Sequence, residues 1–152
     1  MIDAAAAALQ ERIRHGIPMA AAMDYRIVEL AETQIRVEAP LAPNVNVHGT
    51  AFAGSLYALG ILTAWGLCAH RIDLAGITAD LVVAEAHIRY RAPVRGLIAC
   101  RGALEPALAA AFIDDLEHKG RARTSVRVEI GRGPAARIDA TMYASLTPSP
   151  TR

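Results

Sequence analysis

The feature that most constrains this chain is a long stretch without charge near its middle. No Asp, Glu, Lys or Arg occurs from Gly49 to Ala69. A helix that is apolar on every side either crosses a membrane or is enclosed by its own protein. Glycine, serine and threonine interrupt this stretch, and the segments around it have the pattern of strands. We therefore expect a buried central helix rather than a membrane span.

Six other segments predict β-strands. They lie at residues 25–30, 34–39, 81–91, 97–104, 123–130 and 137–144. In most of them apolar and polar residues alternate, which is typical of a strand with one face in the core. Ile35, Val37 and Ala39, for example, are expected to face inward. The first half of the segment at 81–91 is apolar throughout, which predicts a strand covered on both faces.

Helices are predicted at residues 4–14, 53–70 and 106–119. Asp3 can cap the first of these helices, and Gly16 and Pro18 stop it. Together the segments indicate an α+β fold in which an antiparallel sheet wraps around one central helix. We expect a single domain over residues 1–152, with the N-terminal helix in residues 1–17 and a tail at 147–152.

Composition narrows the possible classes of protein. The net charge of +1 and the absence of a dense Arg/Lys run predict no nucleic-acid partner. Cys68 and Cys100 lack the spacing of a CxxC or metal motif, which favours two buried thiols in a reducing compartment. Asp3 and Glu11 interrupt the N-terminal segment, which is therefore unlike a signal peptide. We expect a cytoplasmic protein without a metal ion or cofactor.

A polar turn leads directly into the predicted central helix. It contains Asn44, Asn46, His48, Gly49 and Thr50. Such a turn places backbone N–H donors beside apolar surface, an arrangement that can hold a carbonyl group while an acyl chain lies in apolar surroundings. The structural alternatives are that Asn46 forms the turn and that Thr50 caps the helix, and for Thr50 we expect the cap.

Two blocks of sequence resemble the hotdog-fold thioesterases, in particular the thioesterase family that also occurs fused behind acetyltransferase domains. The first block is 43–57, with the pattern Pro-Asn-Val-Asn-Val-His-Gly-Thr-Ala-Phe-Ala-Gly-Ser-Leu-Tyr, and the second is 88–96, with Ile-Arg-Tyr-Arg-Ala-Pro-Val-Arg-Gly. The resemblance covers roughly residues 18–146. It implies hydrolysis of acyl-CoA or acyl-carrier-protein thioesters by a homodimer or tetramer, with active sites between subunits. Pairing with a second copy is also one way to cover the edges of such a sheet.

One departure from the family pattern concerns the catalytic group. Many hotdog thioesterases carry an Asp or Glu on the central helix, whereas residues 53–70 contain neither, and Phe52 stands where several relatives have a His. We expect Asn46 to hold the carbonyl or the water, and Glu85 to act as the base if its side chain points into a cleft. The alternative for Glu85 is a carboxylate on the outer face of the sheet, paired with an arginine.

The remaining contacts with substrate are expected from the same two blocks. They comprise His48, Gly49, Thr50, Gly54, Ser55, Tyr57 and His87, of which His87 shares the strand face of Glu85. Arg89, Arg91 and Arg95 either meet the phosphates of coenzyme A or form a solvated strand face. A non-catalytic acyl-CoA or fatty-acyl binding protein is the second functional hypothesis, because the helix lacks an acid. The paired His and carboxylate motifs of a dehydratase or hydratase are absent.

Overall fold

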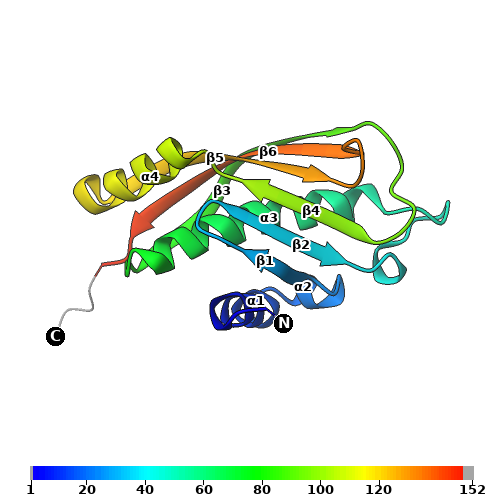
Figure 1. The fold of residues 1–152 in the computed structure, drawn as a ribbon, viewed down its shortest axis with the longest axis horizontal. Helices are drawn as coiled ribbons and strands as arrows, with labels where there is room; N and C mark the ends of the chain where they lie inside the picture. The colour runs from blue at the N-terminus through cyan, green and yellow to red at the C-terminus, as the bar shows by residue number, and fades with distance from the viewer. Residues whose placement is uncertain (1, 149–152) are drawn as a thin grey trace.

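One long helix, α3 (Ala53–Leu74), lies against a six-stranded antiparallel sheet in the computed structural model, which describes residues 2–148. The strands are β1 (Arg26–Leu30), β2 (Gln34–Ala39), β3 (Ala79–Tyr90), β4 (Ile98–Ala103), β5 (Arg121–Ile130) and β6 (Ala136–Leu146). Their order in the sheet is β1-β2-β4-β5-β6-β3, so that β1 and β3 form its two edges (Figure 1). The other helices are α1 (Ala4–Gly16), α2 (Pro18–Ala22), the 3₁₀ turn η1 (Ala42–Asn44) and α4 (Pro106–Lys119).

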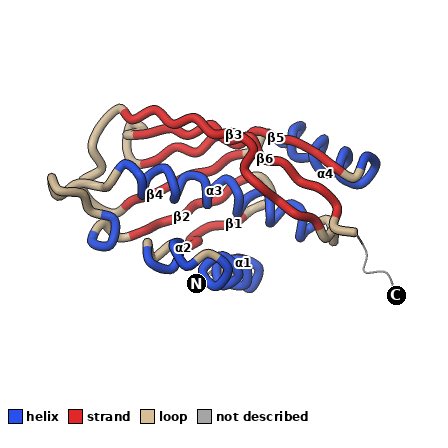
Figure 2. Tube along the Cα trace, turned by 180° about the vertical axis from the view of Figure 1, so that it is seen from behind, coloured by secondary structure: helices blue, strands red, loops and turns tan. Residues whose placement is uncertain are grey.

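The predicted buried helix is confirmed. Leu59, Ala64 and Leu67 of α3 are fully buried, and Figure 2 shows the helix lying across one face of the sheet. The helices α1 and α2 lie near the β1 edge, where α1 contacts both β1 and α3. None of the helices within the described residues is both long and apolar enough to cross a membrane.

The two faces of the sheet differ in chemistry, as the alternation predicted. Ile35, Val37 and Val128 are buried against α3, whereas Arg36 and Arg127 lie on the outer face. In β6 the buried residues Ile138 and Met142 likewise alternate with exposed or half-buried polar ones. The core therefore lies between α3 and the inner face, and the outer face carries most of the charge of the sheet.

Two helices differ from the sequence prediction. The helix α3 continues to Leu74, and Ala75 and Gly76 end it rather than His70. A second short helix, α2, follows Pro18, because proline suits the first position of a helix as well as the end of the previous one. Only residues 147 and 148 of the predicted tail are described, and the rest of it lies outside the described residues.

The prediction of a strand covered on both faces was wrong for β3. This strand pairs only with β6, so it forms an edge, and Val82 on its outer face is 52% exposed. Leu81 and Val83 are half-buried on the side of α3. The apolar first half of β3 therefore has one partly buried face, on the side of α3. Its edge is open, because no further strand of the described chain pairs with β3.

Gly102→Ala is expected to lower the free energy of unfolding by about 1–3 kcal/mol, because the added methyl group would overfill the contact between β4 and α3. A Cβ at this position would lie 2.8 Å from Cγ2 of Ile35 and 3.1 Å from Cγ2 of Thr63. Gly16→Ala is the matched control, since nothing lies within 4 Å of the corresponding Cβ. Urea denaturation of both variants checks this, and equal stability of the two would contradict the packing argument.

Candidate functional site

The loop before α3 is organised by one side chain, that of Asn46. Its amide nitrogen donates to Oγ1 of Thr50 at 2.9 Å and to the carbonyl of Ala51 at 3.3 Å. Its oxygen accepts from the backbone N–H groups of His48 at 2.8 Å and Thr50 at 3.1 Å. Both donors and both acceptor positions are therefore used within the loop. These bonds match the turn-forming alternative, and contact of Asn46 with a substrate carbonyl stays a prediction.

Asn44 fixes the base of the same loop. Its buried side chain donates to the carbonyls of Met23 at 2.9 Å and Pro40 at 2.8 Å. Its own carbonyl accepts from the N–H of Phe52 at 2.7 Å, one residue before α3. The loop is thus tied both to the end of α2 and to the start of the central helix.

The second sequence block holds the first block in place. The carbonyl of Val94 accepts from the N–H of Ala51 at 2.8 Å, and the hydroxyl of Tyr90 donates to the carbonyl of Ala53 at 2.8 Å. Partial burial, with a smaller contribution from nearby Tyr57, raises the pKa of Tyr90, so the hydroxyl keeps its proton. Figure 1 shows the connection after β3 and the loop before α3 at the same end of the sheet.

The N-terminus of α3 has free hydrogen-bond donors. Its N-cap residue is Phe52, and no side chain within residues 2–148 caps the helix. The first turn contains Ala53, Gly54 and Ser55, whose N–H groups point out of the helix end and have no intrahelical partner. The expectation that Thr50 caps the helix was wrong, because Thr50 lies two residues before the N-cap and its hydroxyl accepts from Asn46.

Apolar surface surrounds these donors. The ring of Phe52 lies over Gly54, where a Cβ would come within 2.4 Å of the Cε1 atom of the ring. Phe52 is 54% exposed and Val47 in the preceding loop is 95% exposed. A glycine at position 54 lets the ring lie this close to the helix. The arrangement therefore places unpaired N–H donors beside exposed apolar side chains, as the sequence predicted.

Glu85 and His87 lie away from the loop before α3 and from the N-terminus of that helix. In β3 they pair with Thr141 and Asp139 of β6, and all four side chains are on the outer face of the sheet. Oε1 of Glu85 is 2.9 Å from Nε2 of His87, and the two side chains are 66% and 78% exposed. Within one chain the structure does not bring them to the N-terminus of α3. A role for Glu85 as the base stays a prediction.

The other residues predicted to contact substrate lie together at the start of α3. His48, Gly49 and Thr50 belong to the loop, with Gly49 in the left-handed region at φ 77°, and Gly54, Ser55 and Tyr57 belong to the first turns of α3. The prediction missed the contacts of Phe52 and Tyr90 with the helix end. The Tyr-x-x-Pro-x-x-Gly spacing from Tyr90 to Gly96 was the available signal, but spacing alone does not say what a side chain touches.

Neither cysteine is a reactive thiol, and the described residues contain no cluster of metal ligands. Burial raises the pKa of both Cys68 and Cys100 to about 12, which keeps the thiols protonated and unreactive at neutral pH. Within residues 2–148, no three His, Cys, Asp or Glu side chains gather in a way that holds a metal ion.

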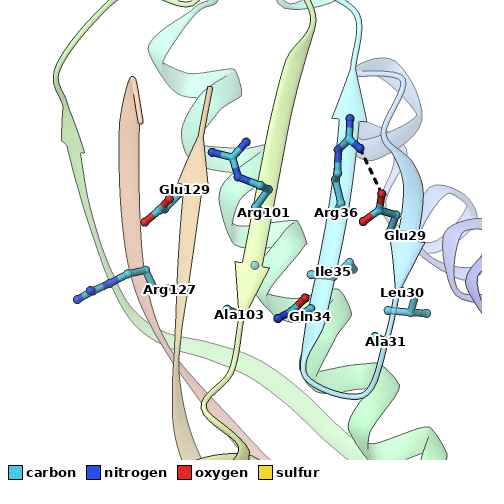
Figure 3. Close-up of a pocket in the computed structure, with 11 residues that line it drawn as sticks. Glu29, Leu30, Ala31, Gln34, Ile35, Arg36, Arg101, Ala103, Arg127 and Glu129 are labelled. Carbon is cyan, nitrogen blue, oxygen red and sulfur yellow. Dashed lines mark hydrogen bonds and ion pairs between the residues drawn. The ribbon is translucent and has the colours of Figure 1, made fainter. Parts of the chain in front are cut away.

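A hollow of about 450 Å³ lies on the outer face over β1, β2, β4 and β5 (Figure 3). Its charged residues have both signs, and Arg36 forms an ion pair with Glu29 at 3.3 Å. This hollow lies on the opposite face of the sheet from α3, and none of the residues that line it belongs to the loop before the helix.

The antiparallel sheet wrapped on a long central helix, with a polar loop at the start of that helix, is the hotdog fold of thioesterase-like proteins. The chain belongs to the family described as "Putative thioesterase (yiiD_Cterm)", which matches residues 6–143.

Solved structures agree with this assignment. A protein of unknown function from Chlorobaculum tepidum is 26% identical, with a TM-score of 0.89 over 93% of this chain and 94% of that one. A protein described as the "putative thioesterase from Shewanella oneidensis" is 29% identical, with a TM-score of 0.84 over 96% and 100% of the two chains. A "Probable Thioesterase" from Pseudomonas aeruginosa, 21% identical with a TM-score of 0.79 over 93% and 95%, shows the likeness of fold alone.

The role of Asn46 in ordering the loop can be measured without a substrate. In Asn46→Ala the backbone N–H protons of His48 and Thr50 are expected to exchange with solvent about tenfold faster, because they lose their acceptor. Asn46→Asp retains the acceptor oxygens and is expected to keep both protons protected. Amide exchange by NMR measures this, and unchanged protection in the alanine variant would show that the loop does not depend on Asn46.

Proposed function

We propose that this protein hydrolyses an acyl thioester, carried by coenzyme A or an acyl-carrier protein, to a free acid and a thiol. The observation that carries the proposal is the uncapped N-terminus of α3, with its free N–H groups beside Phe52 and Gly54. Membership of the family supports the reaction class. The two buried free thiols suit a reducing compartment, so the cytoplasm is the proposed location.

The helix end supplies what the reaction needs most. When water attacks the thioester carbonyl carbon, negative charge develops on the carbonyl oxygen. The N–H groups of Gly54 and Ser55, together with the helix dipole, would stabilise that charge. The C–S bond then breaks, the sulfur takes up a proton, and the acid and the thiol leave. The exposed side chains of Phe52 and Val47 would contact the apolar part of the acyl group.

Two side chains, those of Glu85 and His48, are candidates for the group that activates water. Glu85 faces away from the helix end in its own chain, so it would act there only from a neighbouring subunit. His48 is the titratable side chain on the loop itself, and its exposed imidazole would contact the thioester or the water. Asn46 would act by holding this loop in shape, in addition to any contact with substrate.

A non-catalytic acyl-CoA or fatty-acyl binding protein is the second candidate function. The observation in its favour is that α3 carries no acidic residue until Asp73, in its last turn. Such a protein would bind the acyl-CoA without releasing a free thiol, which separates the two functions experimentally.

Thiol release from a panel of acyl-CoAs, from short to long and aromatic, tests the reaction. Wild-type protein is expected to release thiol, and Gly54→Ala is expected to lower kcat/KM about a hundredfold by displacing the ring of Phe52 from the helix end. The double variant Phe52→Ala/Gly54→Ala removes the clash and is expected to recover part of the rate. Binding of acyl-CoA without any thiol release would favour the second candidate.

The variant Glu85→Gln, measured in the same assay, tests whether Glu85 acts as the general base. Loss of a general base lowers the rate about 10²- to 10⁴-fold, whereas loss of an exposed carboxylate on the outer face changes it little. From the geometry of the single chain we expect less than about a twofold change. A hundredfold loss in a folded variant would establish Glu85 as the base and place it at the site of a neighbouring subunit.

A homodimer is the proposed smallest assembly. The edge strand β3 leaves one row of backbone N–H and C=O groups unpaired, and pairing with a second copy would satisfy them. Analytical ultracentrifugation is expected to give about 32 kDa or 64 kDa, which is two or four times the 16.1 kDa of one chain. A stable species of 16.1 kDa at micromolar concentration would contradict this prediction.

A further inference from the structure

A second hollow of about 610 Å³ lies at the end of the outer face where the loop before α3 is found. Four arginines from separate segments line it: Arg36 of β2, Arg95 of the β3–β4 connection, Arg101 of β4 and Arg132 of the β5–β6 turn. No carboxylate is among the residues that line the hollow. The whole chain has a net charge of only +1, so this is a local concentration of positive charge.

Among the described residues, three of the four arginines have no acidic partner. Arg36 is compensated by Glu38 at 2.5 Å and by Glu29 at 3.3 Å. Within residues 2–148, no carboxylate oxygen lies within 4.0 Å of Arg95, Arg101 or Arg132. Arg101 donates one bond, to the carbonyl of Gly131 at 3.1 Å, which fixes its direction. Planar guanidinium groups bind phosphate oxygens in a bidentate manner, so a phosphate-bearing ligand matches this set of donors.

The hollow and the helix end are separated by a single turn. Val94 lines the hollow, and its carbonyl also accepts from the N–H of Ala51 at 2.8 Å, two residues before α3. The turn at 93–97 therefore has the hollow on one side and the loop of the proposed reaction site on the other. Figure 3 shows the side chains of Arg36 and Arg101 both pointing toward this end of the sheet.

We propose that this hollow binds the phosphate groups of the nucleotide half of coenzyme A. The choice of coenzyme A rests on the proposed function, and the phosphate chemistry rests on the arginines. The hollow is concave and of the size that small-molecule ligands occupy, which favours a nucleotide over the surface of an acidic carrier protein. Leu97, which is exposed at its rim, provides apolar contact for the base.

Binding of free coenzyme A, measured by calorimetry, tests the site directly. Arg95→Gln/Arg132→Gln is expected to weaken Kd at least about tenfold, because two charge-assisted contacts to phosphate are lost. Arg121→Gln is the matched control, an exposed arginine at the opposite end of β5, and is expected to leave Kd unchanged. Pantetheine, which has no phosphate, is expected to bind all three proteins equally. An unchanged Kd for coenzyme A in the double variant overturns the proposal.

Steady-state kinetics separate this proposal from the proposed function. The double variant is expected to raise KM for acyl-CoA about tenfold and to leave kcat/KM for the corresponding acyl-pantetheine unchanged. Arginine-dependent binding of coenzyme A without thiol release from any substrate supports the hollow and refutes the thioesterase. A raised KM for an acyl-carrier protein, with unchanged binding of coenzyme A, overturns the nucleotide assignment in favour of the acidic protein.

Discussion

Burial of α3 against the inner face of the sheet is the constraint on which the rest of the structure depends. A helix of 22 residues without charge in most of its length has no stable place in water, so the sheet must cover it. The alternation of β2, β5 and β6 supplies the apolar face that does so. Gly102 on β4 shows how close the two layers are, since even one methyl group would meet Ile35 and Thr63. The first turn of the helix is exposed, and Ile61 and Trp65 in its middle are half-buried.

The N-terminal end of α3 is shaped by three polar side chains that bond to the backbone or to side chains of their own chain. The side-chain amide of Asn46 forms its hydrogen bonds within the loop. The side chain of Asn44 donates to the carbonyl of Met23 at the base of the loop, and the hydroxyl of Tyr90 donates to the carbonyl of Ala53, the first residue of the helix. Because these three side chains are engaged, the proposed donors to the carbonyl oxygen are the backbone N–H groups of Gly54 and Ser55. In the proposed reaction these side chains hold the loop and the helix end in shape, and the main chain of the helix stabilises the developing charge beside Phe52.

Much of the fold could be predicted from the sequence, and about half of the site. The strands, the central helix and the inward-facing residues follow from periodicity, and both cysteines are buried as expected. The edge position of β3 could not be predicted, because strand order depends on pairings between distant segments. The loop residues of the site are contiguous in sequence and were found together. Glu85 belongs to a strand, where alternation defines two faces without saying which one meets the helix end.

The sequence by itself determined a central helix without charge over residues 53–70, a polar loop directly before it and strands with one apolar face. Each of these features depends on residues that are neighbours along the chain. The tertiary structure decided the rest. It placed Glu85 and His87 on the outer face through the register with β6, and it directed the amide of Asn46 into its own loop. It also gathered four arginines from separate segments around one hollow. Such arrangements depend on strand order and register, which local patterns do not encode.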